Sequence, residues 1–371
     1  MLPPCLFNSY LSQHDPSGAR FGGHAYWEPV GKRKGDRPLG VALAGLGNYS
    51  ETVLAPGLEL TRHCRLAGLV SSSPEKIKTW QERYRIPDKN VYTYATFDQI
   101  ANDPDIDVVY IVTPNALHAP LTHRAATAGK HVWCEKPMAM SAQEAQSMID
   151  ICRKHRVGLS IGYRLQHEPN NQQLIAWAKE RPFGAIRRLS IKAGHDVYRG
   201  VAKDQRPWRL RAKHGGGAML DMGVYTLNAA RYATQAEPIA VNARSWTDRP
   251  DLFDEVDEHM HYTLEFPGDI QAECETSFGK ELNALRVDCE KGWYTLEPYQ
   301  SYSGIHGKAS DGRVLNATYH HLQAMQMDND AKALLEGTPF IVPGEDGLQD
   351  MRIIEAIYAS ARQNGQRVDI V

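Results

Sequence analysis

The 371-residue chain lacks the features that mark several special classes of protein. Its charges nearly cancel, with 42 Lys and Arg against 44 Asp and Glu, so there is no excess positive charge for nucleic-acid binding. Its longest apolar runs, such as 41–46 and 108–112, fall far short of the ~18 residues of a membrane span. Six scattered cysteines without C-x-x-C spacing argue against a disulfide framework or a zinc site. We therefore expect a globular enzyme without metal, nucleic-acid partner or membrane partner.

The first 38 residues also lack an export signal. Their first basic residue is Arg20, and prolines interrupt the only short apolar stretch. The sequence thus predicts a cytoplasmic protein, with a periplasmic one left open if the N-terminus given is truncated. Because the segment is rich in glycine, proline and charge, it is either a disordered tail or an arm anchored by Tyr26 and Trp27.

The length and the patterns along the chain predict two domains and an appendage. At ~150 residues per domain, 371 residues allow two. The expected divisions are an arm over 1–38, a dinucleotide-binding Rossmann domain over 39–160 and an α+β domain over 161–371, which makes the fold class α/β. The α+β domain is expected to contain an open, mostly antiparallel sheet.

A glycine-rich turn opens the first domain. The run from Leu39 reads as a buried strand, as a parallel sheet covered on both faces requires. It leads into Gly45 and Gly47, which allow a tight turn and close approach of the backbone to a pyrophosphate. The third glycine of the G-x-G-x-x-G pattern is replaced by Ser50.

Alternating strands and helices strengthen the dinucleotide prediction. The expected helices include Ala116–Ala128 and Ser141–His155, the second beginning with an S-x-x-E capping box. This alternation is typical of a doubly wound domain. The further expected strands are Arg65–Ser71, Asp107–Thr113 and His131–Cys134.

The end of the second strand favours NADP over NAD. An NAD site usually carries an acidic residue there, which binds the ribose 2′-hydroxyl. This chain has Ser71, Ser73 and Lys76 instead, and such hydroxyl and ammonium groups can donate to a 2′-phosphate. The competing interpretation is an ordinary Ser-Pro helix start with a solvated lysine.

Two segments carry candidate catalytic groups. Lys136 follows the fourth strand, at the sheet edge where ligands bind in open α/β folds. Asp221 and Tyr225 are spaced to share one face of a helix that follows a triple glycine. Because a neighbouring ammonium favours the phenolate form of a tyrosine, Lys136 and Tyr225 could act together. Taken singly, each residue is as compatible with a loop lysine or a core aromatic.

The second domain is expected to pair with another subunit. Residues 270–278 alternate apolar and polar side chains, which predicts a strand with one solvated face. A sheet covered by helices on one side must bury its other face, and a second subunit is a natural solution. We therefore expect a homodimer or homotetramer through this sheet.

These motifs together resemble a known family, that of glucose–fructose oxidoreductase, inositol dehydrogenase and MocA-type proteins. The resemblance runs from about residue 39 to the C-terminus. Tyr225 stands where most of the family has histidine, which favours the glucose–fructose oxidoreductase branch. The motifs that carry it are AGLG (44–47), TPNALH (113–118), GKHVWCEKPMA (129–139), GYR (162–164), WRLR (208–211) and GGGAMLDMGVY (215–225).

The resemblance implies a role for each matching residue. Lys136, Asp221 and Tyr225 would be catalytic, and they would bind substrate together with Tyr319. The implied cofactor-binding residues are Gly45, Leu46, Gly47, Asn48, Tyr49, Ser71, Ser73, Lys76, Tyr94, Thr113, Pro114, Asn115, His118, Glu135, Lys136, Arg164, Trp208 and Arg209.

The function expected is an NADP-dependent sugar oxidoreductase, transferring hydride between nicotinamide and a sugar carbon. An aldose would become a lactone, and retained NADP could then reduce a second sugar. The alternatives are a dehydrogenase of another polyol or sugar derivative with dissociable NAD(P), and a non-catalytic NADP-sensing regulator.

Overall fold

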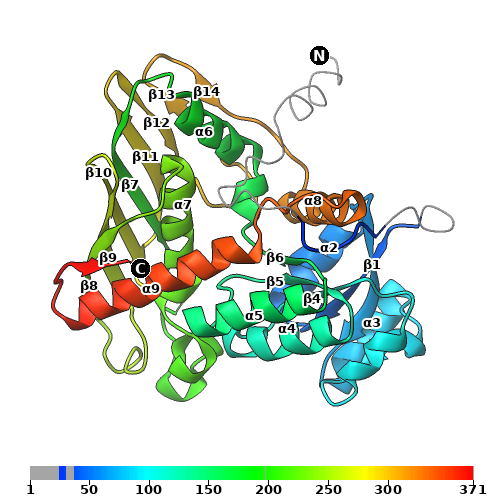
Figure 1. The fold of residues 1–371 in the computed structure, drawn as a ribbon. Coiled ribbons are helices and arrows are strands. Elements are labelled where there is room, and N and C mark those ends of the chain that lie inside the picture. The colour runs from blue at the N-terminus through cyan, green and yellow to red at the C-terminus, as the bar shows by residue number, and fades with distance from the viewer. Residues whose placement is uncertain (1–24, 31–36, 197, 371) are drawn as a thin grey trace.

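The computed structural model describes residues 25–30, 37–196 and 198–370, and it contains two large sheets joined by helices (Figure 1). Most of the arm expected over 1–38 lies outside these residues. Among the helices described, none is long and apolar enough to cross a bilayer.

The first sheet is the parallel one that the sequence predicts. All of its strand pairs are parallel, in the order β3-β2-β1-β4-β5-β6. Strands β1 to β3 are therefore added toward one edge of the sheet and β4 to β6 toward the other, so the strand order reverses between β1 and β4. Its strands are β1 (Leu39–Ala44), β2 (Cys64–Val70), β3 (Val91–Tyr92), β4 (Val108–Ile111), β5 (His131–Cys134) and β6 (Leu159–Ile161).

Alternate residues of the parallel strands enter two different cores. In β4, Val109 and Ile111 pack with α4 and α5, whereas Val108 and Tyr110 pack with the helices of the opposite face. Both faces are therefore covered, which is why β1 and β4 read as unbroken apolar runs. The helices are α2 (Ala55–Leu58), α3 (Pro74–Tyr84), α4 (His118–Thr127) and α5 (Ala142–Lys154).

The capping box predicted at α5 forms, with one difference. Ser141 Oγ accepts the Glu144 backbone N–H at 3.1 Å, as expected. The Glu144 carboxylate, however, accepts the N–H of Met140 at 3.0 Å, one residue before the cap. The helix after Gly47 also differs from a regular helix, because it begins with a π-helical turn over Ser50–Leu54.

The second sheet has nine strands in the order β14-β13-β12-β11-β7-β10-β9-β8-β15. Only the central β7–β10 pair is parallel among these strands, so the predicted mostly antiparallel sheet is confirmed. The strands are β7 (Ile186–Gly194), β8 (Ala240–Trp246), β9 (His259–Phe266), β10 (Ile270–Ser277), β11 (Leu282–Cys289), β12 (Gly292–Leu296), β13 (Gly307–Ala309), β14 (Val314–Leu315) and β15 (Val368–Asp369).

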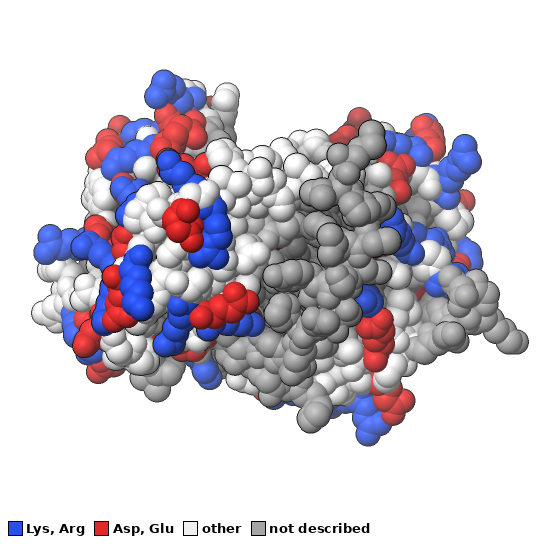
Figure 2. All heavy atoms as spheres, turned by 90° about the horizontal axis from the view of Figure 1, so that it is seen from above, with Lys and Arg blue, Asp and Glu red and all other residues white. Residues whose placement is uncertain are grey.

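The two faces of this sheet have different chemistry. On its inner face, α7 packs against β7 and β10, and α9 packs against β8. On β10, Glu273 and Glu275 alternate with buried neighbours and pair with basic side chains of β7. Seen from above, the surface of the whole molecule also shows acidic and basic side chains interspersed (Figure 2). The helices are α6 (Pro169–Glu180), α7 (Val224–Thr234), α8 (Leu322–Glu336) and α9 (Gly344–Arg362).

The C-terminal part of the chain returns to the parallel sheet. Leu334 of α8 lies in one core of that sheet, and the Ile161 N–H donates to Val342 at 3.0 Å. The described part of the arm meets the same helix. Trp27 stacks on Phe340 with ring centroids 4.6 Å apart, and the Val30 N–H donates to Leu334 at 3.0 Å.

Candidate active site

The glycine-rich turn after β1 is shaped to hold a phosphate group. Gly45 has φ of +107°, and a Cβ there would lie 2.3 Å from the Val112 carbonyl oxygen. At Gly47, no atom of the described residues lies within 4 Å of where a Cβ would stand, so the backbone faces open space. Ser50 Oγ donates to the Gly45 carbonyl at 2.6 Å, which fixes the turn without a third glycine. Both glycine roles that the motif requires are thus present.

The residues expected at a 2′-phosphate gather at the start of α3. Ser73 Oγ caps the helix by accepting the Lys76 N–H, and Ser71 Oγ accepts the Ser73 N–H at 3.2 Å. The Lys76 ammonium donates to the Leu46 carbonyl at 3.0 Å. The structure therefore brings these side chains together beside the phosphate turn, although the serines also serve an ordinary helix start.

His118 joins the two loops that follow β4 and β5. Its Nδ1 lies 2.8 Å from the Pro137 carbonyl and its Nε2 lies 3.0 Å from that of Thr113. Burial lowers its pKa. Because both ring nitrogens contact backbone carbonyls, His118 links the loops after β4 and β5 and has no ring nitrogen left for a ligand. Asn115 connects the same wall to the second domain by donating to Gly215 at 2.7 Å.

Glu135 lies at the carboxyl end of β5 against the core. Its Oε1 accepts the Tyr110 hydroxyl at 2.7 Å. A Cβ at Gly162 would lie 2.8 Å from this carboxylate, so the glycine of the GYR motif makes room for it. Burial raises the pKa of Glu135, although the Tyr110 hydrogen bond and the charge of Lys136 oppose that shift.

Lys136, Asp221 and Tyr225 converge where the loop after β5 meets the helical segment that follows the triple glycine. The Lys136 ammonium donates to the Asp221 carbonyl at 2.8 Å and lies 3.3 Å from its Oδ1. It also stands 4.6 Å from the centre of the Tyr225 ring. Arg209 donates to the other Asp221 oxygen at 3.1 Å. Two segments about 85 residues apart in the sequence thus form one contact group, in which Lys136 lies against both Asp221 and Tyr225.

The charges of this group fix its protonation. Burial raises the pKa of Asp221, but Lys136 and Arg209 outweigh it and lower the pKa to about 2. Burial lowers the pKa of Lys136, but the electrostatic effect of Tyr225, Asp221 and Glu135 raises it above the usual value. Asp221 is therefore an anion and Lys136 a cation at neutral pH.

The helix that carries Asp221 and Tyr225 differs from the expected one. Residues Met219–Gly223 form a π-helical turn, and the α-helix begins only at Val224. Asp221 and Tyr225 therefore belong to different kinds of helical turn instead of one regular face. Both residues still contact the same side chain, that of Lys136.

The triple glycine lets this helix begin against other backbone. A Cβ at Gly216 would lie 2.2 Å from the Arg209 carbonyl, and one at Gly217 would lie 2.4 Å from Asp257 Oδ1. Asp257 in turn accepts the Met219 N–H at 2.7 Å and the Tyr358 hydroxyl at 2.7 Å. Asp257 is a positioning residue that the sequence reasoning missed, because it lies in an acidic loop without any motif.

Several tyrosine rings lie around Arg164 and the glycine-rich turn. Arg164, whose side chain is buried, donates to the Tyr225 hydroxyl. Tyr49 of the phosphate turn accepts from Gln323 of α8 at 3.3 Å, and its ring lies 6.3 Å from that of Tyr302. Tyr302 and Gln323 were not predicted, since each lies in a segment without a recognisable pattern.

The remaining predicted residues are more peripheral. The Tyr319 hydroxyl is buried without a hydrogen-bond partner among the described residues, and its pKa is raised to about 12, mainly by burial. Thr113 Oγ1 is also buried and unpartnered in the described part of the chain. Trp208 lies under the Arg209 guanidinium at 4.5 Å. Tyr94 packs against the core of the first domain, and its carbonyl accepts from Arg124.

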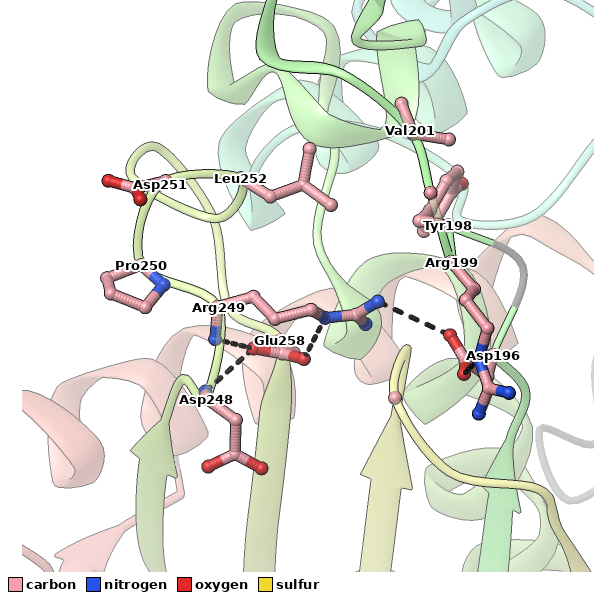
Figure 3. A pocket seen from close by; sticks show the side chains of 12 residues that line it. Asp196, Tyr198, Arg199, Val201, Asp248, Arg249, Pro250, Asp251, Leu252 and Glu258 are labelled. Atoms are coloured by element: carbon pink, nitrogen blue, oxygen red, sulfur yellow. Dashed lines mark hydrogen bonds and ion pairs between the residues drawn. The ribbon is translucent and has the colours of Figure 1, made fainter.

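A hollow of about 600 Å³ lies at the end of the second sheet (Figure 3). Arg249 points into it, and its guanidinium contacts Glu258, Asp196 and the Phe278 carbonyl. The Arg249 guanidinium is thus already hydrogen-bonded to groups of the protein itself. Tyr198 lines the hollow, and its pKa is raised mainly by burial and further by the charge of Asp221.

Comparison with known proteins settles the family. A model of the oxidoreductase family with an NAD-binding Rossmann fold matches residues 39–163, and a model of the GFO/IDH/MocA C-terminal domain matches residues 171–295. The chain belongs to the GFO/IDH/MocA family. This confirms the resemblance drawn from the motifs, the Rossmann domain and the prediction of an oxidoreductase.

Similar members of the GFO/IDH/MocA family include sugar enzymes. The aldose-aldose oxidoreductase from Caulobacter crescentus, solved with glycerol, is 40% identical with a TM-score of 0.85, covering 90% of this chain and 100% of that one. A D-xylose 1-dehydrogenase [NADP(+)] of Haloarcula marismortui is 29% identical over 90% of this chain and 94% of the relative. An uncharacterized oxidoreductase of Rhizobium meliloti is 31% identical over 73% of this chain and 82% of the relative.

Proposed function

We propose that this protein is an NADP-dependent oxidoreductase that oxidises an aldose to its lactone. The observation that carries the proposal is the contact group of Lys136, Asp221 and Tyr225, which lies at the carboxyl edge of the parallel sheet. The names of the aldose-aldose oxidoreductase and the NADP-dependent xylose dehydrogenase support a sugar substrate and NADP.

The residues of the first domain fit a bound dinucleotide. The turn at Gly45 and Gly47 would hold its pyrophosphate against backbone N–H groups. Ser71, Ser73 and Lys76 would hold the 2′-phosphate, which a carboxylate at this position would repel. When bound, NADP supplies a nicotinamide ring that exchanges hydride with a carbon.

The chain's own groups would move the proton of the reacting hydroxyl. The Lys136 ammonium lies over the Tyr225 ring, and Arg164 donates to the Tyr225 hydroxyl. The two cations would stabilise the phenolate form of Tyr225, which then accepts the proton of the sugar hydroxyl and becomes neutral. Asp221, ionised between Lys136 and Arg209, fixes the ammonium in this position.

A second sugar would be reduced in the same site if NADP stays bound. The Caulobacter relative's name, aldose-aldose oxidoreductase, favours this coupled mode over one in which the cofactor leaves after each turnover. In the coupled mode, one aldose gives a lactone and another accepts the hydride to give an alditol. Purified protein should then carry NADP(H) without any being added.

A panel of aldoses tests the proposal. Purified protein with NADP should convert one or a few aldoses. Absorbance at 340 nm should accumulate if NADPH leaves the site, whereas lactone and alditol should form in equal amounts without it if NADP(H) stays bound. In either mode the Tyr225→Phe variant should lose ~100-fold or more in kcat. The variant keeps the ring over Lys136 and loses only the hydroxyl. Equal activity in both proteins would reject the role of Tyr225. NADP binding with no sugar turned over would favour the sensing regulator.

We also propose that the nine-stranded sheet mediates a homodimer or homotetramer. Its outer face is a network of ion pairs such as Arg188–Glu273 and Lys192–Glu275, which a second copy of the sheet could complement. Light scattering should give at least twice the 41.5 kDa monomer mass. A monomer at micromolar concentration would refute this part.

A further inference from the structure

Arg164 is held between two tyrosine rings at the base of the cleft. Its guanidinium carbon lies 4.8 Å from the centre of the Tyr225 ring and 4.7 Å from that of Tyr302. One of its nitrogens donates to the Tyr225 hydroxyl, and another lies 3.5 Å from Gln300 Oε1. Arg164 is 3% exposed, whereas Tyr302 is 53% exposed. A buried charge is thus covered on one side by a half-exposed ring.

The loop that carries Tyr302 is fixed at its base. It joins β12 to β13, and Asn283 Oδ1 accepts the N–H groups of both Tyr299 and Gln300 at 3.0 Å. At its far end, Asn170 donates to the Ile305 carbonyl at 3.0 Å. The loop can therefore hold one side chain over the cleft at a defined place.

We propose that Arg164 positions the Tyr225 hydroxyl for proton transfer and that the Tyr302 ring holds Arg164 in place. A guanidinium stacked on an aromatic ring is attracted to the ring face, and its planar fork is then fixed in orientation. Arg164 acts on the reaction only through Tyr225, and Tyr302 only through Arg164. The inference rests on the proposed function, since it assigns the proton transfer to Tyr225.

Other groups around Tyr225 do not duplicate this arrangement. Lys136, Tyr49, Tyr299 and Tyr302 interact electrostatically with Tyr225 or with Arg164. Among the described residues, however, Arg164 is the group with a recorded hydrogen bond to the Tyr225 hydroxyl. Lys136 meets the ring face instead, 4.6 Å from its centre. The two cations therefore act on different parts of the same side chain.

Two substitutions at Tyr302 separate the ring from its hydroxyl. Tyr302→Leu should lower kcat about 10- to 100-fold with a sugar KM within about twofold, the loss expected for a displaced hydrogen bond to a charged group. The acid limb of its pH–kcat profile should move to higher pH. Tyr302→Phe keeps the ring and should match the parent protein. Because the residue is half-exposed, neither change threatens folding.

A measurement without substrate keeps the inference testable on its own. The phenolate absorbance of Tyr225 at 295 nm, taken as the difference from Tyr225→Phe, should appear at higher pH in Tyr302→Leu and in Arg164→Gln. It should be unchanged in Tyr302→Phe, and NADPH binding by fluorescence should be unchanged in both Tyr302 variants.

Three results would overturn the inference: equal kcat in Tyr302→Leu and Tyr302→Phe, a change confined to KM, or an unmoved phenolate band. Failure of the parent protein to oxidise any sugar would refute the proposed function and leave the absorbance test standing.

Discussion

The helical segment 219–234 carries a charged cluster near each end, and the two clusters are built for different work. At its start, Asp221 shares Lys136 and Arg209 and lies in the cleft. At its end, Arg231 is fully buried and pairs with Asp346 and Asp350 of α9. Both clusters are cation–carboxylate contacts. The first also contacts Tyr225, because Lys136 lies 4.6 Å from the centre of its ring.

The surroundings decide what each cluster does. The two carboxylates around Arg231 are held further by Asn228, which donates to Asp346 and Asp350 at 3.0 and 2.9 Å. Gln166, from the segment after β6, also donates to Asp346 at 3.0 Å, and Glu237 pairs with Arg231, so the cluster joins α7 and α9 to neighbouring segments. Around Asp221, the partners come from separate loops that meet at the cleft. The same charge chemistry is thus structural at one end and, in our proposal, catalytic at the other.

Removing Lys136 should have the largest effect on activity. Lys136→Ala should reduce kcat about 10³- to 10⁴-fold, in the range for lost acid–base catalysis with its electrostatic support. Its free energy of unfolding should fall by about 1–3 kcal/mol, less than for a carboxylate left without any cation, since Asp221 keeps Arg209. Steady-state kinetics and urea unfolding measure the two. Activity within tenfold of the parent protein would remove Lys136 from the mechanism.

Removing Arg231 should lower the stability of the protein much more than its activity. Arg231→Met leaves two buried carboxylates without their main cation and should destabilise the protein by about 3–5 kcal/mol. The double variant Arg231→Met with Asp350→Asn should recover part of that loss. NADP binding to the folded fraction should be unaffected. A change in unfolding free energy of less than about 1 kcal/mol would show that the cluster does not stabilise the packing of these helices.

The two aspartates should respond to pH with opposite signs. Burial raises the pKa of Asp350 to about 6, against Arg231, so its stabilisation is complete below the unfolded value near 3.8 and is lost as pH rises through 6. For Asp221, with a pKa of about 2, stabilisation exists above 3.8 and is lost as pH falls toward 2.

Each shift corresponds to about 2–3 kcal/mol. Unfolding free energies measured from pH 3 to 7 should flatten between 4 and 6 in Asp350→Asn. Asp221→Asn should leave that window unchanged. A parent profile that rises through this window and is unaltered by Asp350→Asn would contradict the assignment.

The smallest expected effect concerns Asp257, which holds the start of the helical segment that carries Asp221. Asp257→Ala removes the acceptor for the Met219 N–H and should cost about 1–3 kcal/mol of stability, together with a fall in kcat. Tyr358→Phe removes only the other bond to Asp257 and should cost about 0.5–1.5 kcal/mol. A kcat loss in Asp257→Ala with an unchanged sugar KM would identify it as positioning the helix.

The parallel half of the fold could be predicted closely because both faces of its strands are buried. Val108–Ile111 and residues 132–134 are apolar without interruption, so the existence of these two strands is visible in the sequence. Small shifts remained, as in the second strand, which spans Cys64–Val70 instead of Arg65–Ser71. Hydrophobic periodicity does not fix an end residue or reveal a π-helical turn such as Met219–Gly223.

The candidate site could be predicted only where a motif names its residues. Lys136, Asp221 and Tyr225 lie in motifs, and the structure brings them into contact. Asp257 and Tyr302 reach the same place from loops whose positions depend on tertiary packing. Their sequence neighbourhoods contain no periodic or turn signal that could have indicated them.

The packing of α8 on the parallel sheet has a consequence for how this protein can be divided. Leu334 and Phe340 belong to the same core as Val41 and Trp133. A gene cut after residue 160 would therefore express a nucleotide-binding half missing part of its own interior. Fragment complementation or domain recombination in this chain must carry the segment 322–343 along with the first domain. The two domains follow one another in the sequence, but a late segment of the chain completes the core of the first.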